Sequence, residues 1–186
     1  SWFVLNSYTR NEHKVEDYLS QVENLQFFIP KRYALRNYYG RVKRELVPLI
    51  PGMVFVRDVY DKVQQLQKDV SFLGFATLSD GVRRMPMKVP DYQMDNFIRV
   101  VQHFEENLTY FRPDELQLNK GSYVKIIGGK FDGAKGELLK IKGKRSKRLV
   151  VCIPQIMAVA ATHIEPEFIR VISEEEFLKD EELKIE

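Results

Sequence analysis

Residues 121–141 read GSYVKIIGGKFDGAKGELLKI, and this stretch decides the fold expected for the second half of the chain. Apolar and polar residues alternate over 123–127, which is typical of a strand with one buried face. Glycines then recur at 128, 129, 133 and 136, where the lack of a Cβ permits a tight reversal of the chain. Phe131 lies among them and is expected to plug the end of a small barrel. The stretch therefore predicts a β-hairpin turned by glycines.

The segments downstream continue as short strands. Together with 123–127, they give five expected strands, at 136–142, 148–153, 157–163 and 168–172. Short strands separated by turn residues are typical of a small, strongly bent β-barrel. Propensity leaves one point open, because residues 156–161 also fit a helix.

The first half of the chain alternates between strand and helix patterns. Expected strands at 2–7, 25–33, 42–49, 53–56 and 70–78 are interleaved with helices at 10–22 and 58–68 and a third helix with Pro90 in its first turn. A hairpin tip is expected at Tyr38–Gly40, and turns at Pro51–Gly52 and Asp80–Gly81. This order predicts one α/β domain. Residues 105–120 lack periodicity and contain Pro113, which favours a linker.

Charge is divided unevenly along the chain. The 186 residues carry a formal net charge of +3. Residues 173–186 hold seven acidic residues and two lysines, a net of −5, so residues 1–172 carry +8. A basic body with an acidic tail favours a polyanionic partner such as nucleic acid. Ordinary solubility charge on both parts accounts for the same numbers.

The sequence offers little for catalysis. The three histidines lie in three different expected elements without metal-ligand spacing. The single cysteine, Cys152, lies within the apolar run LVVCIP, where cysteine is typically a small buried hydrophobe. The glycine-rich run is not a phosphate loop, because Ala134 follows Gly133 where that motif requires Lys and then Ser or Thr. We therefore expect a protein that is not an enzyme and needs no cofactor or metal.

The expected setting is the cytoplasm. No apolar run approaches the ~20 residues that span a bilayer, and the longest, at 149–153, fits a buried strand. One cysteine also excludes an intrachain disulfide framework. We expect a monomer without membrane contact.

Two parts of the sequence resemble known modules. The glycine stretch resembles the KOW motif, which opens an SH3-like barrel in transcription and ribosomal proteins. The residues that carry this resemblance are Gly121, Val124, Ile126, Gly129, Phe131, Gly133 and Gly136. Residues 1–105 resemble the NGN domain of the NusG family, most specifically through Trp2-Phe3-Val4 and the run PGMVFV at 51–56. Any small barrel with a glycine corner is the alternative for the KOW segment.

The resemblance implies an α+β fold. An N-terminal NGN α/β sandwich, with helices flanking an antiparallel sheet, would be followed by a small SH3-like KOW β-barrel. The implied boundaries are 1–105 for the NGN domain, 106–119 for the linker, 120–172 for the KOW domain and 173–186 for an acidic C-terminal tail.

The resemblance also implies a partner, since NusG-family proteins travel on elongating RNA polymerase. Their NGN domain binds the clamp helices of the largest subunit, and their KOW barrel recruits other partners. Alternation puts Met53 and Phe55 on the side of their strand opposite Val54 and Val56. The side of Met53 and Phe55 is implied to stay open and to dock on the polymerase; the alternative is that these residues are core. The implied polymerase-binding set is Asn6, Ile50, Met53, Phe55, Met94 and Phe97.

Two groups of residues are candidates for contact with nucleic acid. Cations around the expected hairpin are interleaved with tyrosines, a pattern that suits phosphates and exposed bases. These cations are Lys31, Arg32, Arg36, Arg41, Lys43 and Arg44. By resemblance, Lys14, Tyr18 and Lys68 match positions that face the non-template DNA strand in the RfaH group. Non-template DNA and nascent RNA are the expected nucleic-acid partners.

Some departures from the housekeeping NusG pattern make the chain more similar to the operon-specific antiterminators of the RfaH and UpxY groups. They are the bulky hairpin, the acidic tail and the barrel loop, where Ile156 or Met157 replaces the aromatic that binds Rho and a ribosomal protein. The resemblance then implies a factor that suppresses pausing and termination. A housekeeping factor acting with Rho and a ribosome-associated RNA-binding factor stay open as alternatives.

Overall fold

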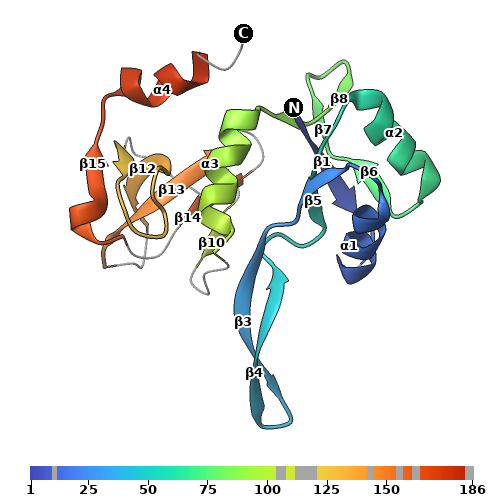
Figure 1. The fold of residues 1–186 in the computed structure, drawn as a ribbon, viewed down its shortest axis with the longest axis horizontal. Coiled ribbons are helices and arrows are strands. Elements are labelled where there is room, and N and C mark those ends of the chain that lie inside the picture. The colour runs from blue at the N-terminus through green and yellow to red at the C-terminus, as the bar shows by residue number, and fades with distance from the viewer. Residues whose placement is uncertain are drawn as a thin grey trace. The chain divides into compact units, whose positions relative to one another are not determined.

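The computed structural model describes residues 1–9, 12–103, 108–111, 121–141, 145–153, 157–160 and 164–182. The chain divides into two compact units, which are treated separately below. The first comprises Ser1–Lys31 and Ile50–Asp91, and the second comprises Arg32–Leu49 and Tyr92–Glu186. Helices and antiparallel sheets occur together, which confirms the predicted α+β class. Figure 1 shows the elements in chain order.

The first unit is built on an antiparallel sheet. Its strands run in the order β2-β5-β1-β6, and β9 also pairs with β1. The elements of this unit are β1 (Trp2–Ser7), α1 (Glu12–Gln21), β2 (Gln26–Phe28), β5 (Met53–Arg57), α2 (Tyr60–Asp69), β6 (Leu73–Phe75), β7 (Thr77–Ser79), β8 (Arg84–Pro86) and β9 (Lys88–Val89).

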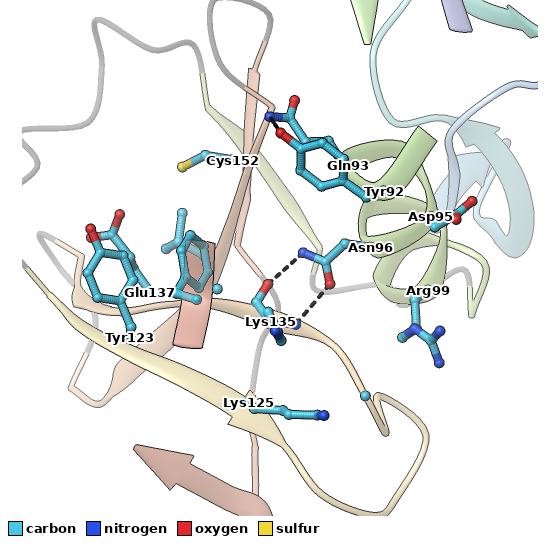
Figure 2. A pocket seen from close by; sticks show the side chains of 14 residues that line it. Tyr92, Gln93, Asp95, Asn96, Arg99, Tyr123, Lys125, Lys135, Glu137 and Cys152 are labelled. Atoms are coloured by element: carbon cyan, nitrogen blue, oxygen red, sulfur yellow. Dashed lines mark hydrogen bonds between the residues drawn. The ribbon is translucent and has the colours of Figure 1, made fainter. Parts of the chain in front are cut away.

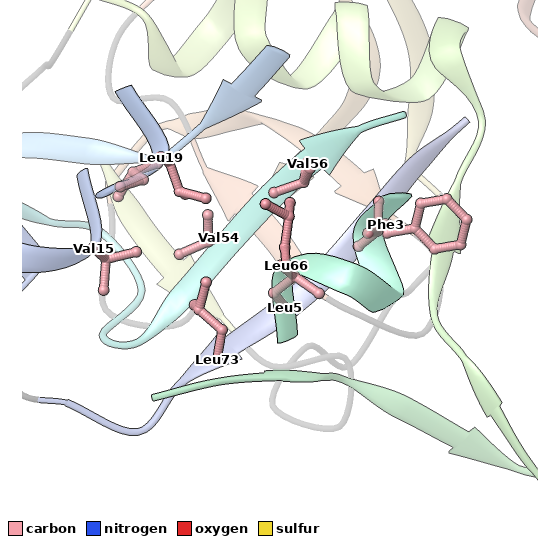
Figure 3. Close-up of a cluster of buried hydrophobic side chains, with 10 residues drawn as sticks. Phe3, Leu5, Val15, Leu19, Val54, Val56, Leu66 and Leu73 are labelled. Atoms are coloured by element: carbon pink, nitrogen blue, oxygen red, sulfur yellow. The ribbon is translucent and has the colours of Figure 1, made fainter. Parts of the chain in front are cut away.

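One face of this sheet packs against the two helices. The buried cluster takes side chains from both helices and from β1, β5 and β6 (Figure 3); it comprises Phe3, Leu5, Val15, Leu19, Ile29, Val54, Val56, Val63, Leu66 and Leu73. Burial of apolar side chains supplies about 1.5–3 kcal/mol for each large residue, so this cluster holds α1 and α2 on the sheet. The prediction that Val54 and Val56 face the helices is confirmed.

Several strand boundaries in the first unit differ from those expected. The segment 25–33 is divided by Pro30 into β2 and the start of the next strand, because proline cannot donate a ladder hydrogen bond. The segment 70–78 is divided at Ala76, whose N–H donates to the carbonyl of Val4 and whose carbonyl accepts from Met87. The short strands β8 and β9 have no strong sequence pattern and were not predicted.

The remaining elements belong mainly to the second unit. They are β3 (Lys31–Tyr38), β4 (Arg41–Pro48), α3 (Asp91–Val101), β10 (Thr109–Phe111), β11 (Ser122–Ile126), β12 (Lys135–Lys140), β13 (Lys147–Ile153), β14 (Met157–Ala160), a 3-10 turn (Pro166–Phe168), β15 (Ile169–Val171) and α4 (Glu174–Glu182). Strands β3 and β4 form a separate two-stranded sheet.

The barrel strands form one six-stranded antiparallel sheet in the order β10-β14-β13-β12-β11-β15. All five predicted strands are present. The open question at residues 156–161 is answered for 157–160, which form β14 and pair with β13. The predicted linker 106–119 contains a strand that was not expected, because Thr109–Phe111 pair with β14 as β10. The predicted domain boundaries at 105 and 119 fall on residues outside the described part of the chain.

The acidic tail, for which no helix or strand was predicted, contains helix α4. The Ser173 hydroxyl accepts a hydrogen bond from the N–H of Glu176 at 3.1 Å and so caps the helix. Acidic residues in the first turn favour a helix N-terminus. The Phe177 ring stacks on Tyr123 of β11 with centroids 4.6 Å apart, and Glu176 pairs with Arg170. These contacts attach α4 to the barrel.

Within the described ranges, no helix has the length and apolar character that crossing a bilayer requires.

Candidate functional site

The residues predicted to dock on a partner differ in exposure. Met53 and Asn6 are directly paired across β5 and β1, and both are partly exposed. Phe55 pairs with Val4 and with Phe28, and its ring has no exposed surface. The structure thus places Met53 and Phe55 on the side of β5 away from the helix core, but only the Met53 end of that side reaches solvent.

The other predicted docking residues are buried. Ile50 precedes the Pro51–Gly52 turn and is 5% exposed, while Met94 and Phe97 have no exposed surface. The last two lie three residues apart on α3, which puts them on one side of that helix. A docking role for these residues requires that they become exposed when a partner binds.

The β3–β4 hairpin has two chemically different faces. Side chains two apart in a strand share a face, and two contacts show which residues of β3 and β4 lie together. The Tyr38 hydroxyl donates to a Glu45 carboxylate oxygen at 3.0 Å, whereas the Arg44 guanidinium lies 3.8 Å from the Tyr33 ring centroid. The basic face therefore comprises Arg32, Arg36, Tyr38, Arg41 and Lys43, together with Glu45. The apolar face comprises Tyr33, Leu35, Val42 and Leu46, together with Lys31 and Arg44.

The hairpin ends in a tight turn at Tyr39 and Gly40. Both residues have positive φ, +49° and +81°, as in a type I′ turn, which confirms the predicted tip. The Asn37 side-chain oxygen accepts a hydrogen bond from the Gly40 N–H at 3.0 Å. Every residue from Leu35 to Arg44 is exposed. The hydrogen bond to Glu45 raises the pKa of Tyr38.

The structure divides the six predicted hairpin cations. Lys31 forms an ion pair with Glu16 at 2.5 Å, and Arg44 covers Tyr33. In the described part of the chain, no acidic side chain forms an ion pair with Arg36, Arg41 or Lys43. These three cations lie on the basic face and are exposed.

The second nucleic-acid group lies at the start of the chain. Lys14 and Tyr18 are one turn apart on α1, and both contact Phe72: the Lys14 Nζ lies 5.0 Å from its ring centroid, and Tyr18 packs edge-on at 5.8 Å. Burial, and then the negative charge of Asp69, raise the pKa of Tyr18. Lys68 is exposed on α2. Sequence reasoning missed Phe72, because nothing in the local pattern shows that this ring lies against α1.

The residues predicted to carry a KOW motif lie in and around the hairpin β11–β12. Val124, Ile126 and Phe131 are buried, and the Phe131 ring packs edge-on to His103 at 5.6 Å. Gly133 has φ +79°, which favours glycine. A Cβ at Gly136 would collide with the carbonyl oxygen of Val150 on the neighbouring strand. Gly121 and Gly129 adjoin the same hairpin, β11–β12.

The predicted partner loop of the barrel consists of Ile156 and Met157. Ile156 lies outside the described residues. Met157 is the first residue of β14 and pairs with Ile153. Its role in binding a partner stays a prediction.

Helix α3 is joined to the barrel by an unexpected polar contact. The Asn96 side chain donates to the carbonyl oxygen of Lys135 at 2.6 Å and accepts from its N–H at 2.8 Å, as shown in Figure 2. Arg99 donates to the Asp132 carbonyl at 3.1 Å. Asn96 thereby satisfies both backbone groups at the start of β12. A single asparagine in a helix gives no sequence signal for this role.

A cavity of about 460 Å³ lies beside this contact. Its walls include Arg99, Lys125 and Lys135 but also Asp95 and Glu137, so its charge favours no single class of ligand. Cys152 also lines it, and burial raises the pKa of the Cys152 thiol to about 11. A thiol that stays protonated is a poor nucleophile. Among the described residues, no group of His, Cys, Asp and Glu could hold a metal ion.

Comparison with known proteins adds a family match. A sequence model of the NusG family, described as transcription termination factor nusG, matches residues 1–98, slightly more than half of the 186 residues. No curated protein matches the chain. A solved structure titled "Domain interaction in Thermotoga maritima NusG" is similar at 23% identity, covers 92% of this chain and 97% of that chain, and has a TM-score of 0.46.

Proposed function

The chain belongs to the NusG family of transcription factors, and we propose that it is a non-enzymatic elongation factor that binds RNA polymerase and suppresses pausing and termination. The observation that carries this proposal is the family match, because residues 1–98 contain all six predicted docking residues. The proposed partner surface is the clamp helices of the largest polymerase subunit. Operon-specific action, as in the RfaH and UpxY groups, is part of the proposal.

The proposed docking face centres on Met53. Val54 and Val56 are committed to the helix core, which leaves the side of Met53 and Phe55 for other contacts. Methionine and phenylalanine suit a helical partner, because flexible and aromatic apolar side chains fill the grooves between helix ridges. Asn6, paired with Met53, gives the face a polar edge. Because Met53 and Asn6 are partly exposed and Phe55 is buried, the partner would contact Met53 and Asn6 first and reach Phe55 only after it becomes exposed.

The effect on termination would follow from that docking. A protein that bridges the two sides of the polymerase cleft and holds the clamp closed disfavours paused states, which require clamp movement. Binding energy that favours the closed state shifts the population toward it in proportion to the difference in affinity. Fewer and shorter pauses then give less time for termination.

A second candidate function is supported by the family's own description as a termination factor. On that interpretation the chain promotes Rho-dependent termination, and the barrel binds Rho. The two functions predict opposite changes in the yield of terminated RNA, so one assay separates them.

The binding proposal is tested by Met53→Asp. Met53 is partly exposed, so the variant is expected to fold, whereas a charge in a desolvated docking site is costly. We expect affinity for core RNA polymerase to fall by at least about 30-fold, equivalent to about 2 kcal/mol. The matched control is Val82→Asp, at a position that is 89% exposed and outside the face. Equal affinity of the two folded variants would remove this face from the proposal.

The effect on transcription is tested by single-round transcription through a pause site and a terminator. Reduced pausing and more read-through support antitermination. Increased termination only when Rho is present supports the second candidate. An unchanged RNA pattern at saturating binding to polymerase contradicts both.

A further inference from the structure

We propose that the basic face and the tip of the β3–β4 hairpin bind single-stranded nucleic acid, with phosphates held at Arg36, Arg41 and Lys43 and an unpaired base stacked on Tyr39. This goes beyond the proposed function and rests on it only for the biological setting. The binding itself is a property of the free protein.

The charge of the basic face favours a polyanion. Arg36, Arg41 and Lys43 are exposed, and no acidic side chain of the described residues pairs with them. The one acid on this face, Glu45, accepts the hydrogen bond from Tyr38. Each of these three cations can neutralise one phosphate, which releases counter-ions from the nucleic acid and favours binding.

The turn carries a second and independent indication. Tyr39 has φ +49°, a conformation in which Asn or Gly is usual and a bulky residue is rare. Its side chain is fully exposed, at 106% of the reference area, so it gains nothing from packing. A large aromatic ring is therefore held in a strained and fully hydrated position. An observed backbone outlier of this kind points to function rather than to stability.

The same features favour a single strand over a duplex. Bases in a duplex stack on one another and present no ring face to Tyr39, whereas unpaired bases stack on exposed aromatics. The basic face offers cations for phosphates and an aromatic tip for a base, which is the pattern of single-strand binders.

The test is fluorescence anisotropy with the full chain and no polymerase. The probes are a fluorescein-labelled single-stranded DNA of about 12 nucleotides, the RNA of the same sequence and the matching DNA duplex. The affinity variant is Arg36→Gln/Arg41→Gln/Lys43→Gln. The matched control, Arg83→Gln/Arg84→Gln/Lys130→Gln, removes the same charge from exposed positions elsewhere. Circular dichroism checks the fold of each variant.

We expect the hairpin triple variant to lower the slope of log K against log salt by about 2, because each phosphate contact on a single strand contributes about 0.7. The control triple variant should leave that slope close to the wild-type value. An unchanged slope for the hairpin variant, or an equal fall for the control, would overturn the assignment of the phosphates to this face.

Tyr39→Asn separates stacking from folding. Asparagine suits the positive φ, so the turn is retained while the ring is lost. We expect single-strand affinity to fall about 5- to 150-fold, the range for loss of one stacked base. Affinity equal to wild type would overturn the tip assignment. Tighter binding of the duplex than of either single strand would overturn the ligand class, and the DNA and RNA probes decide which single strand is preferred.

These outcomes are distinct from those of the polymerase experiments. Loss of polymerase binding by Met53→Asp with unchanged anisotropy leaves the hairpin proposal supported. If the hairpin triple variant leaves the salt slope unchanged and Tyr39→Asn leaves the single-strand affinity unchanged, while polymerase binding is intact, only the hairpin proposal is overturned.

Discussion

Two antiparallel hairpins of this protein, β3–β4 and β11–β12, have similar backbone geometry but differ in how far their side chains are buried. Both reverse direction through residues with positive φ. The β11–β12 hairpin buries Val124, Ile126 and Phe131, whereas every residue from Leu35 to Arg44 of the other hairpin is exposed. A two-stranded ribbon without a packed face adds little stability of its own. Side chains of β11–β12 therefore specify the fold, and those of β3–β4 are available to a partner.

The largest effect expected from this difference is in the barrel. Phe131→Ala removes a ring that is 3% exposed and packed on His103, and should destabilise the barrel by about 3–5 kcal/mol. Hydrogen exchange of peptides covering β11 and β12, followed by mass spectrometry, measures this loss. Protection equal to wild type would mean that the glycine corner is stable without its aromatic plug.

A second effect concerns titration. Each hairpin has a side chain in it or beside it whose pKa is raised, and the causes differ. Burial raises the pKa of Cys152, which lines the cavity beside β12, whereas the hydrogen bond to Glu45 raises the pKa of Tyr38 in β3. Raised from 9.0 to about 11, the pKa of Cys152 should make the folded protein react with iodoacetamide about 100-fold more slowly than the denatured chain near pH 8.5.

The sign of the linked stability change follows from the same shift. The folded state holds the thiol proton more tightly, so this contribution to stability is complete below about pH 9 and is lost as the pH rises through about 11. The Cys152→Ser variant supplies the unlabelled control. Equal alkylation rates for folded and denatured protein would contradict the burial of this thiol.

The smallest effect is expected in the exposed hairpin. Leu35→Ala changes a side chain that is 64% exposed, so the free energy of unfolding should change by less than about 0.5 kcal/mol. Hydrogen exchange under the same conditions provides the comparison with Phe131→Ala. A destabilisation as large as that of Phe131→Ala would show that the apolar face of the hairpin is part of a core, which would end the contrast between the two hairpins.

The local sequence pattern predicted those elements that depend on residues close together in the chain. Strand 2–7 and the hairpin tip at 38–40 were placed where the structure has them. The glycine spacing around Phe131 predicted a buried corner because steric limits on φ act residue by residue. Helix α4 and strand β10 were missed, since each depends on contacts with a distant strand: Phe177 with Tyr123, and β10 with β14.

The candidate site was predicted less completely. Sequence reasoning identified the hairpin cations but treated them as one group. The structure separates Arg36, Arg41 and Lys43 from Lys31 and Arg44, because ion pairing and ring contacts depend on which side chains share a face. It also places Phe55 in a buried position that its strand alternation alone left open.

The sequence by itself determined the order of most strands and helices, the family whose model matches residues 1–98 and the excess of cations on the hairpin. These properties depend on residue identity and short-range spacing. Only the tertiary structure decided that Asn96 binds the backbone of Lys135 and that Phe177 stacks on Tyr123. Burial and hydrogen bonding are set by residues far apart along the chain, so no local pattern contains them.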